Sequence, residues 1–239
     1  MGRCWLLVHS PIVGPDTWEP VAALLRTRGD EVVVPVLRMG DQPYAVRHLE
    51  AATSSPLPAG CRPIVVAHSG AGGLIGAIGH RLRAAGTSPA AYVLADAGVP
   101  AAWPASRLDL LRDEVPELAE QLESILASGG RFPSWTDAQL ASLVPDPDRR
   151  RRLVAGLQPA PAGYWTEPLP VTADWPDAPC AAVLFSGSYE PTAAFATAHG
   201  WPLRRLADDN HFLLLTDPGA VATTLVELAD ELAVDASDR

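Results

Sequence analysis

The segment IVVAHSGAGG, residues 64–73, decides the expected fold of this chain. It opens with four apolar residues, and a continuous apolar run of this length is typical of a strand covered on both faces. Small residues then surround Ser69, and a helical pattern continues from residue 70 to residue 85. We therefore expect a strand that passes through a tight turn into a helix, with Ser69 on the turn.

The same alternation of short apolar runs and helical patterns continues on both sides of this segment. Alternating strands and helices predict an α/β fold with a mainly parallel sheet of about six strands flanked by helices. The other expected strands are residues 4–8, 31–36, 91–95, 181–185 and 203–206, and the other expected helices are 16–28, 44–54 and 218–234.

One long segment, residues 100–179, interrupts the alternation because it contains no convincing strand. It is rich in Pro and Trp, with helical patterns at 106–128, 136–143 and 147–157 and a loop-like tail. An insertion of this size between two strands is typical of a lid. We expect a core of residues 1–99 and 180–239 and a helical cap of residues 100–179.

The composition excludes several classes of function. The chain has 239 residues, a net charge of −10 and 18 cationic residues, all of them Arg. Without Lys it cannot form a Schiff base or a Walker-type phosphate loop. The acidic balance argues against nucleic-acid binding, and no apolar run approaches the roughly 20 residues of a membrane helix. We expect no cofactor and neither a nucleic-acid nor a membrane partner; a homodimer stays open.

The cysteines favour a reduced protein. Cys4, Cys61 and Cys180 are odd in number, scattered, and without metal-ligand spacing. We therefore expect no metal site and a cytoplasmic location.

The turn around Ser69 resembles the nucleophile elbow of the α/β-hydrolase superfamily, with Ala67 and Ala71 in place of the usual glycines. The resemblance covers nearly the whole chain and is closest to compact bacterial enzymes with a helical cap. It implies that Ser69 is the nucleophile and that the Gly70 N–H helps to bind the oxyanion. His68, at the end of the same strand, is expected beside the site.

The resemblance also places a catalytic base at His211, in the loop between the last strand and the C-terminal helix. Two carboxylates remain candidates for the acid of the triad. Glu190 follows the strand at 181–185 with a Gly-x-x-Glu spacing, but it could instead only complement a helix N-terminus. Asp96 follows the strand at 91–95 with no helix directly after it, so we lean slightly toward Asp96.

The N-terminal strand leads into His9-Ser10-Pro11, where the superfamily places a second oxyanion donor. Pro11 has no N–H, so the Ser10 hydroxyl or the Ile12 N–H would have to replace it. A lost donor costs on the order of 100- to 1000-fold in rate. This departure raises the odds of chemistry other than ester hydrolysis.

Aromatic residues are frequent in the expected cap. These aromatic residues either line an apolar pocket or pack the cap on the core, and the sequence favours neither interpretation over the other. They are Trp103, Phe132, Trp135, Tyr164, Trp165 and Trp175. We expect Trp135 to bind substrate, together with Tyr189 beside Glu190.

The main functional hypothesis is a serine hydrolase that cleaves a small hydrophobic ester, thioester or lactone. The alternative enzyme is a non-hydrolytic cyclase or lyase of bacterial secondary metabolism, which Pro11 favours. The hypothesis from another class is a ligand-binding pseudoenzyme, which loss of the nucleophile or base would favour; the sequence retains both Ser69 and His211.

Overall fold

The fold is built on one six-stranded sheet. The computed structural model describes residues 2–206 and 209–234. All neighbouring strands are parallel, in the order β2-β1-β3-β4-β5-β6. The strands are β1 (Cys4–Val8), β2 (Glu31–Val33), β3 (Ile64–His68), β4 (Ala91–Ala95), β5 (Cys180–Leu184) and β6 (Leu203–Arg205). The expected α/β fold with a parallel sheet of about six strands is confirmed.

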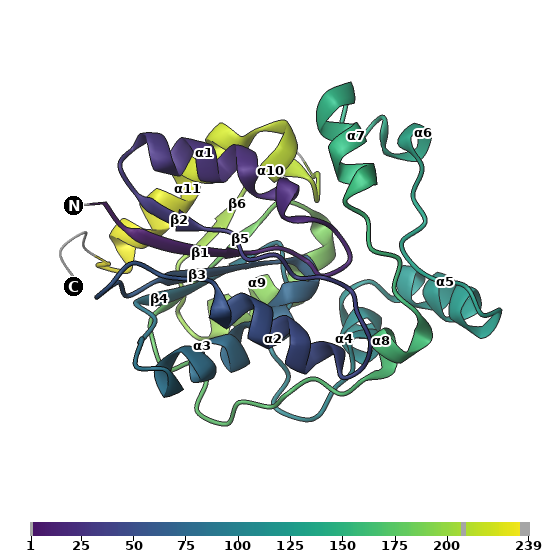
Figure 1. The fold of residues 1–239 in the computed structure, drawn as a ribbon, viewed down its shortest axis with the longest axis horizontal. Coiled ribbons are helices and arrows are strands. Elements are labelled where there is room, and N and C mark those ends of the chain that lie inside the picture. Colours follow the sequence, from purple (N-terminus) through teal and green to yellow (C-terminus); the bar gives the residue numbers. More distant parts are fainter. Residues whose placement is uncertain (1, 207–208, 235–239) are drawn as a thin grey trace.

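Helices cover both faces of the sheet, which explains why its central strands read as continuous apolar runs. Successive side chains of a strand point to opposite faces. Trp5 and Leu7 accordingly pack against α1 (Glu19–Thr27) and α11 (Pro218–Glu231) on one face. Leu6 and Val8 pack on the other face, which carries α2 (Tyr44–Ser54), α3 (Ile75–Ala84) and α9 (Glu190–Ala198). Figure 1 shows the two helical layers above and below the sheet.

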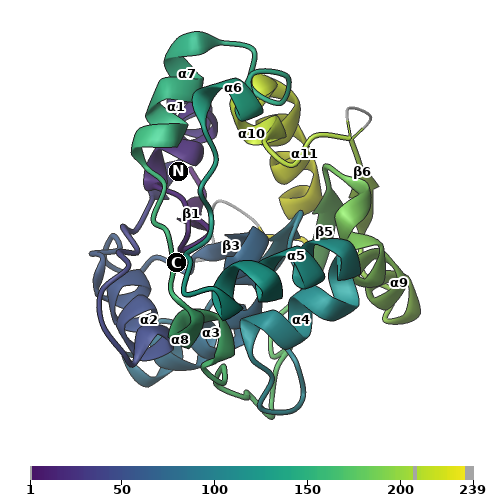
Figure 2. The same cartoon turned by 90° about the vertical axis from the view of Figure 1, so that its right-hand side faces the viewer.

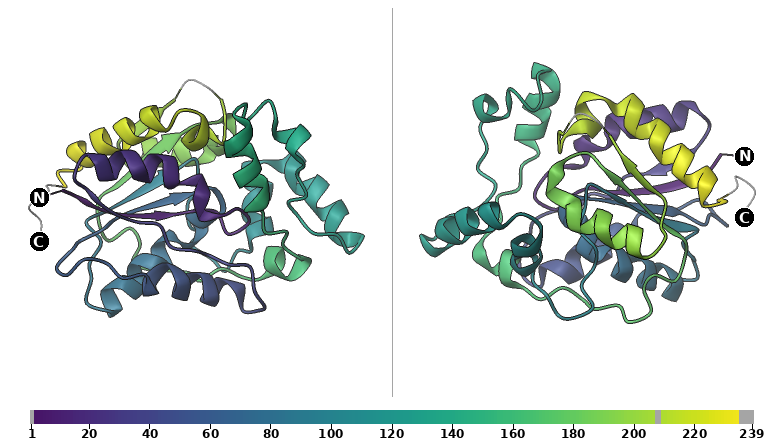
Figure 3. Two further views of the ribbon diagram at one scale, coloured as in Figure 1. Left: turned by 45° about the horizontal axis from the view of Figure 1, so that its top comes forward. Right: turned by 180° about the vertical axis from the view of Figure 1, so that it is seen from behind.

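The segment between β4 and β5, residues 100–179, is called the cap segment here. It contains α4 (Arg107–Glu114), α5 (Pro116–Ala127), α6 (Asp137–Leu140), α7 (Pro147–Ala155) and α8 (Ala162–Thr166). In Figure 2 these helices surround the carboxyl ends of the strands, and both views of Figure 3 show α5, α6 and α7 projecting beyond that edge. This edge of a parallel sheet is where ligands bind in such folds.

Some expected elements differ in extent. The helix expected at 106–128 is two helices, α4 and α5, because Pro116 lacks an N–H and disfavours a helical residue before it. The strand expected at 31–36 ends at Val33 on the sheet edge, before Pro35. The tail expected as loop contains the short helix α8.

The expectation of reduced cysteines is wrong in this structure, because Cys4 and Cys61 form a disulfide. Trp5 of β1 pairs with Ile64 of β3, so Cys4, the first residue of β1, lies beside Cys61, which precedes β3, and their Cα atoms are 6.2 Å apart. Cys180 is free and buried. A disulfide is typical of oxidising compartments. The cytoplasmic location stays a prediction, and this disulfide weighs against it.

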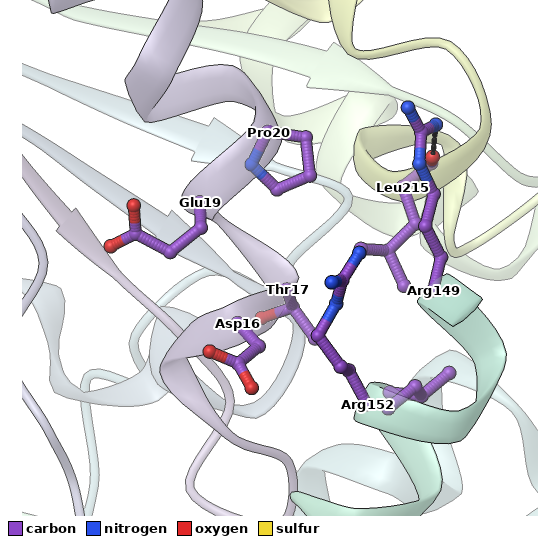
Figure 4. Close-up of a pocket in the computed structure, with 8 residues that line it drawn as sticks. Asp16, Thr17, Glu19, Pro20, Arg149, Arg152 and Leu215 are labelled. Atoms are coloured by element: carbon purple, nitrogen blue, oxygen red, sulfur yellow. Dashed lines mark hydrogen bonds between the residues drawn. The ribbon is translucent and has the colours of Figure 1, made fainter.

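Helix α7 is attached to the core beside the 3-10 helix η1 (Pro15–Thr17). Arg149 donates a hydrogen bond to the Leu215 carbonyl of α10 (Leu213–Thr216). The surface pocket at this junction, about 290 Å³, also contains Asp16, Glu19 and Arg152 (Figure 4). Its cations and carboxylates offset each other, and it holds no reactive side chain. Within 2–206 and 209–234, no helix combines the length and apolarity needed to cross a membrane.

Candidate active site

Ser69 occupies a sharp turn between β3 and the 3-10 helix η2 (Ser69–Leu74). Its φ of +56° lies in the left-handed region, which is costly for a residue with a side chain and recurs at functional sites. The Ser69 N–H donates to the Asp96 carbonyl oxygen at 3.1 Å, which ties the turn to the end of β4. A Cβ atom on Gly72 would lie 2.2 Å from the Gly98 carbonyl oxygen, so close packing explains the small residues of this turn.

The hydroxyl of Ser10 lies beside the residue that follows Ser69. A Cβ atom built on Gly70 would be 3.1 Å from Ser10 Oγ. Ser10 is buried, and its Oγ has no hydrogen-bond partner within the described residues. Pro11 offers no N–H here, and Ile12 lines the adjoining cavity. A free hydroxyl at this position could donate to an oxyanion.

Asp96 directly follows β4 and is fully buried. It also has a left-handed φ, +46°. Its carboxylate accepts hydrogen bonds from the N–H groups of Phe185 (2.8 Å) and Ser186 (3.0 Å) and from the Ser186 hydroxyl (2.8 Å). Burial alone would raise the pKa of Asp96, but the hydrogen bond and charge of His211 and these other donors together lower it. The carboxylate is therefore held ionised.

His211 lies at the cavity with Nδ1 only 2.6 Å from Asp96 Oδ2. Its side chain is 28% exposed and lines the cavity. Because Nδ1–H donates to the carboxylate, Nε2 of the neutral ring is free to accept a proton. The hydroxyl of Tyr189 donates to Ser69 Oγ at 3.5 Å. Within the described residues, the Ser69 hydroxyl forms no other hydrogen bond than this weak one.

The two candidate acids differ clearly in position. Asp96 contacts His211, whereas Glu190 forms a two-pronged ion pair with Arg205 at the surface. The Glu190 side chain is 56% exposed. The structure does not bring Glu190 to His211, because it begins α9 and its carboxylate turns toward β6. The geometry favours Asp96.

His68, expected beside the site, lies beneath His211 and not in the cavity wall. His68 is 1% exposed and absent from the cavity wall. Its ring stacks on His211 with the centroids 4.6 Å apart, and its Nε2–H donates to the His211 carbonyl oxygen at 3.2 Å. Burial, with the charge of His211, lowers the pKa of His68 to about 3. His68 is therefore a neutral support beneath His211.

A cavity of about 340 Å³ joins these residues to the cap segment. Ser10, Ile12, Ser69, Gly70, Tyr189 and His211 all line it. Of the cap aromatics, Phe132, Trp135, Tyr164 and Trp165 line it as well. Trp103 is instead exposed, and Trp175 packs on Tyr92 and Trp201 under the sheet. The cavity wall is mainly apolar, which suits a hydrophobic substrate.

Two charged residues of the cavity were not anticipated from the sequence. Arg107 and Glu114 stand at the two ends of α4, and both line the cavity. Burial, with a smaller contribution from Asp113, raises the pKa of Glu114 to about 8. A helical pattern alone does not tell which polar residues of an amphipathic helix face a pocket. No sequence signal therefore set Arg107 and Glu114 apart from the exposed charged residues of the same helix.

Among the residues that the structure describes, no three His, Cys, Asp or Glu side chains lie close enough together to hold a metal ion. The chemistry available at the site is that of a hydroxyl, an imidazole and a carboxylate. These three groups are the components of a nucleophile-base-acid triad.

Residues 5–224 match the model of the alpha/beta hydrolase family. An extracellular α/β-hydrolase from a Paenibacillus species superposes with a TM-score of 0.71 and 16% identity, covering 95% of this chain and 98% of that one. Polyneuridine aldehyde esterase superposes with a TM-score of 0.68 and 16% identity, covering 96% of this chain and 100% of that one.

Tomato methylketone synthase I, complexed with 2-tridecanone, superposes with a TM-score of 0.65 and 16% identity, covering 97% of this chain and 99% of that one. At these identities the likeness establishes the fold. The comparison with curated protein sequences finds no match. The family match spans nearly the entire chain, and the protein therefore belongs to the α/β-hydrolase family.

Proposed function

We propose that the protein is a serine hydrolase that cleaves a small hydrophobic ester, thioester or lactone. The observation that carries the proposal is the 2.6 Å contact between His211 Nδ1 and Asp96 Oδ2, in a cavity that also contains Ser69 on its left-handed turn. An oriented base beside a strained serine is the arrangement that activates a hydroxyl for attack.

In the first half of the reaction, His211 Nε2 takes the proton of Ser69 Oγ as the oxygen bonds to the substrate carbonyl carbon. The charge that develops on the imidazole is balanced by Asp96. The bond to the leaving alcohol or thiol then breaks, and His211 returns the proton to that group. In the second half, His211 activates a water, which releases the acid and frees Ser69.

Because Tyr189 is the donor in its bond to Ser69, the Ser69 hydroxyl keeps its own proton available for His211. This bond is long, 3.5 Å, so it holds the Ser69 hydroxyl only weakly and allows the hydroxyl to turn toward His211. Catalytic hydrogen bonds often tighten only when substrate binds. Burial and the charge of Glu114 raise the pKa of Tyr189 well above its usual value, so the phenol stays protonated and can donate.

The oxyanion would be bound by the Gly70 N–H and the Ser10 hydroxyl. The unpartnered Ser10 Oγ supports this pairing, since it lies beside Gly70 without another hydrogen bond to break. A side-chain donor of this kind replaces the amide that Pro11 lacks.

A second candidate is a non-hydrolytic cyclase or lyase of secondary metabolism. The missing N–H at Pro11 and the Tyr189 contact to Ser69 favour it, because both suit proton transfer better than an acyl-enzyme. Tomato methylketone synthase I, by its name a synthase, has the same fold. A ligand-binding protein without catalysis is the third candidate.

The test uses a fluorophosphonate, which forms a stable bond to an activated serine, and intact-mass measurement. We expect one label on the native protein and none on Ser69→Ala, with Ser188→Ala, another serine of the cavity wall, labelled normally. Hydrolysis of 4-nitrophenyl butyrate should fall at least about a thousandfold in Ser69→Ala. A folded native protein that is neither labelled nor hydrolytic would exclude the serine-hydrolase proposal in favour of the other two.

A further inference from the structure

Arg107 is held rigidly at the start of α4. Ser106 caps this helix by accepting from the Asp109 N–H, while the Asp109 carboxylate accepts from the Ser106 N–H at 2.9 Å. An antiparallel bridge between Ser106 and Pro168 ties the same point to the chain that follows α8. The guanidinium carbon then lies 4.1 Å from the centre of the Tyr164 ring, and Nη1 donates to the Tyr164 carbonyl at 3.3 Å.

The guanidinium forms no ion pair with any residue that the structure describes. Arg107 is only 5% exposed, and its Nε and Nη2 atoms are buried without a hydrogen-bond partner. Glu167, which follows α8 near Tyr164, does not pair with Arg107. Its carboxylate accepts a hydrogen bond from the Ala45 N–H at 2.9 Å. Arg112 on the same helix shows the usual situation, since it pairs with Asp109 and Glu123 at the surface.

A buried cation with unused donors is costly, and its cost is recovered when an anion binds it. The planar guanidinium matches a carboxylate, which can accept two parallel N–H bonds. Arg107 also lines the cavity that contains Ser69. We propose that Arg107 is the recognition site for a carboxylate on the substrate, so that the preferred substrate is an ester or thioester that carries a second, anionic end. This inference rests on the proposed hydrolase function.

The position of Arg107 relative to Ser69 sets the shape of such a substrate. The Tyr164 hydroxyl is 4.0 Å from a Cβ atom built on Gly70, and the guanidinium covers the ring of the same tyrosine. The anion site is thus about one aromatic ring away from the oxyanion site. A short apolar chain would connect the reacting carbonyl to the carboxylate, along the mainly apolar wall.

The other titratable groups near the cavity do not cancel this positive charge at neutral pH. Burial, with the charge of Arg107, lowers the pKa of His48 to about 4, so this neighbour is neutral. The pKa of Glu114, about 8, keeps most of that carboxyl group protonated at pH 7. Asp96 is not part of the cavity wall, and its carboxylate accepts hydrogen bonds from His211, Phe185 and Ser186.

The kinetic test compares 4-nitrophenyl hemiglutarate, which carries a free carboxylate, with neutral 4-nitrophenyl valerate. We expect kcat/KM of the native protein to favour the hemiglutarate, and the ratio of the two values to fall about ten- to a hundredfold in Arg107→Gln. Arg107→Lys should retain part of the preference. Arg112→Gln, which removes a surface arginine of the same helix, should leave the ratio unchanged.

A binding measurement separates this proposal from the hydrolase proposal. Ser69→Ala cannot turn over, and glutarate should still raise its melting temperature, an effect that the additional change Arg107→Gln abolishes. Equal kcat/KM values for the two esters in the native protein, or glutarate stabilisation that survives Arg107→Gln, would overturn the carboxylate site. Glutarate binding without any ester hydrolysis would overturn the hydrolase function alone.

Discussion

Replacing Glu114 by Gln should make the protein more stable, and increasingly so as the pH rises. The Glu114 carboxyl group fills the space over Gly98, where a Cβ atom would lie 1.7 Å from Oε1. Burial raises its pKa from 4.5 to about 8. A carboxyl whose pKa is raised in the folded state contributes stability at low pH, and this contribution is lost as the pH rises from 4.5 through 8. Gln cannot ionise and avoids the loss.

The size of the effect follows from the pKa difference. Each pH unit between the two pKa values is worth about 1.36 kcal/mol. From pH 6 to about pH 8 the unfolded carboxyl group is ionised while the folded one stays protonated, so over these two units the advantage of Glu114→Gln should grow by up to about 3 kcal/mol. This figure is an upper bound, because the half-buried side chain meets water in the cavity, which screens part of the energy.

The assay is urea unfolding of the native protein and Glu114→Gln at pH 6 and pH 9, with the free energy of unfolding extrapolated to water. Comparing the two proteins at each pH removes the titration of all other groups. Glu120→Gln is the matched control, since Glu120 is exposed on the neighbouring helix α5. A difference between native protein and Glu114→Gln that is the same at both pH values would refute the reasoning.

Three further predictions follow from the site and the sheet. Asp96→Asn should lower kcat/KM by about a thousand- to ten-thousandfold, because an amide cannot hold the His211 tautomer or its charge; Glu190→Gln should stay near native activity, and the reverse order in ester assays would disprove the assignment. Ser10→Ala should lower kcat about a hundred- to a thousandfold with little change in KM, and a loss below fivefold would remove Ser10 from the oxyanion site. Cys4→Ser with Cys61→Ser should lower the free energy of unfolding by about 4 kcal/mol, since the disulfide closes a loop across 57 positions; a native melting temperature that is indifferent to reductant would contradict this.

The fold was predictable because local patterns specify most of it. Buried parallel strands leave continuous apolar runs, and the turn at Ser69 needs small residues, so both are visible in the chain. The break before Pro116 was visible too, but it was missed because the apolar pattern continues across it. Ser69 was a candidate because it directly follows a strand, and His211 was one because it lies in the loop before the C-terminal helix.

The remaining features depend on distances across the fold. Asp96 and Glu190 follow neighbouring strands, and only the three-dimensional arrangement shows which carboxylate turns toward His211. The Cys4–Cys61 disulfide depends on β1 lying next to β3, which the spacing of the cysteines does not reveal.

The cap segment has a consequence for how this protein can change its substrate over evolutionary time. It leaves the sheet shortly after Asp96 and returns into β5, which ends at the N–H groups that hold the same carboxylate. The two strands that flank the segment thus meet at one buried side chain at their carboxyl ends. Arg107 and Glu114 lie within the segment, whereas Ser69, Asp96 and His211 lie outside it. Under the two proposals, the arginine that selects the substrate and the groups that cleave the bond are encoded in separate stretches of the gene, so the cap segment can vary while the reacting groups stay unchanged.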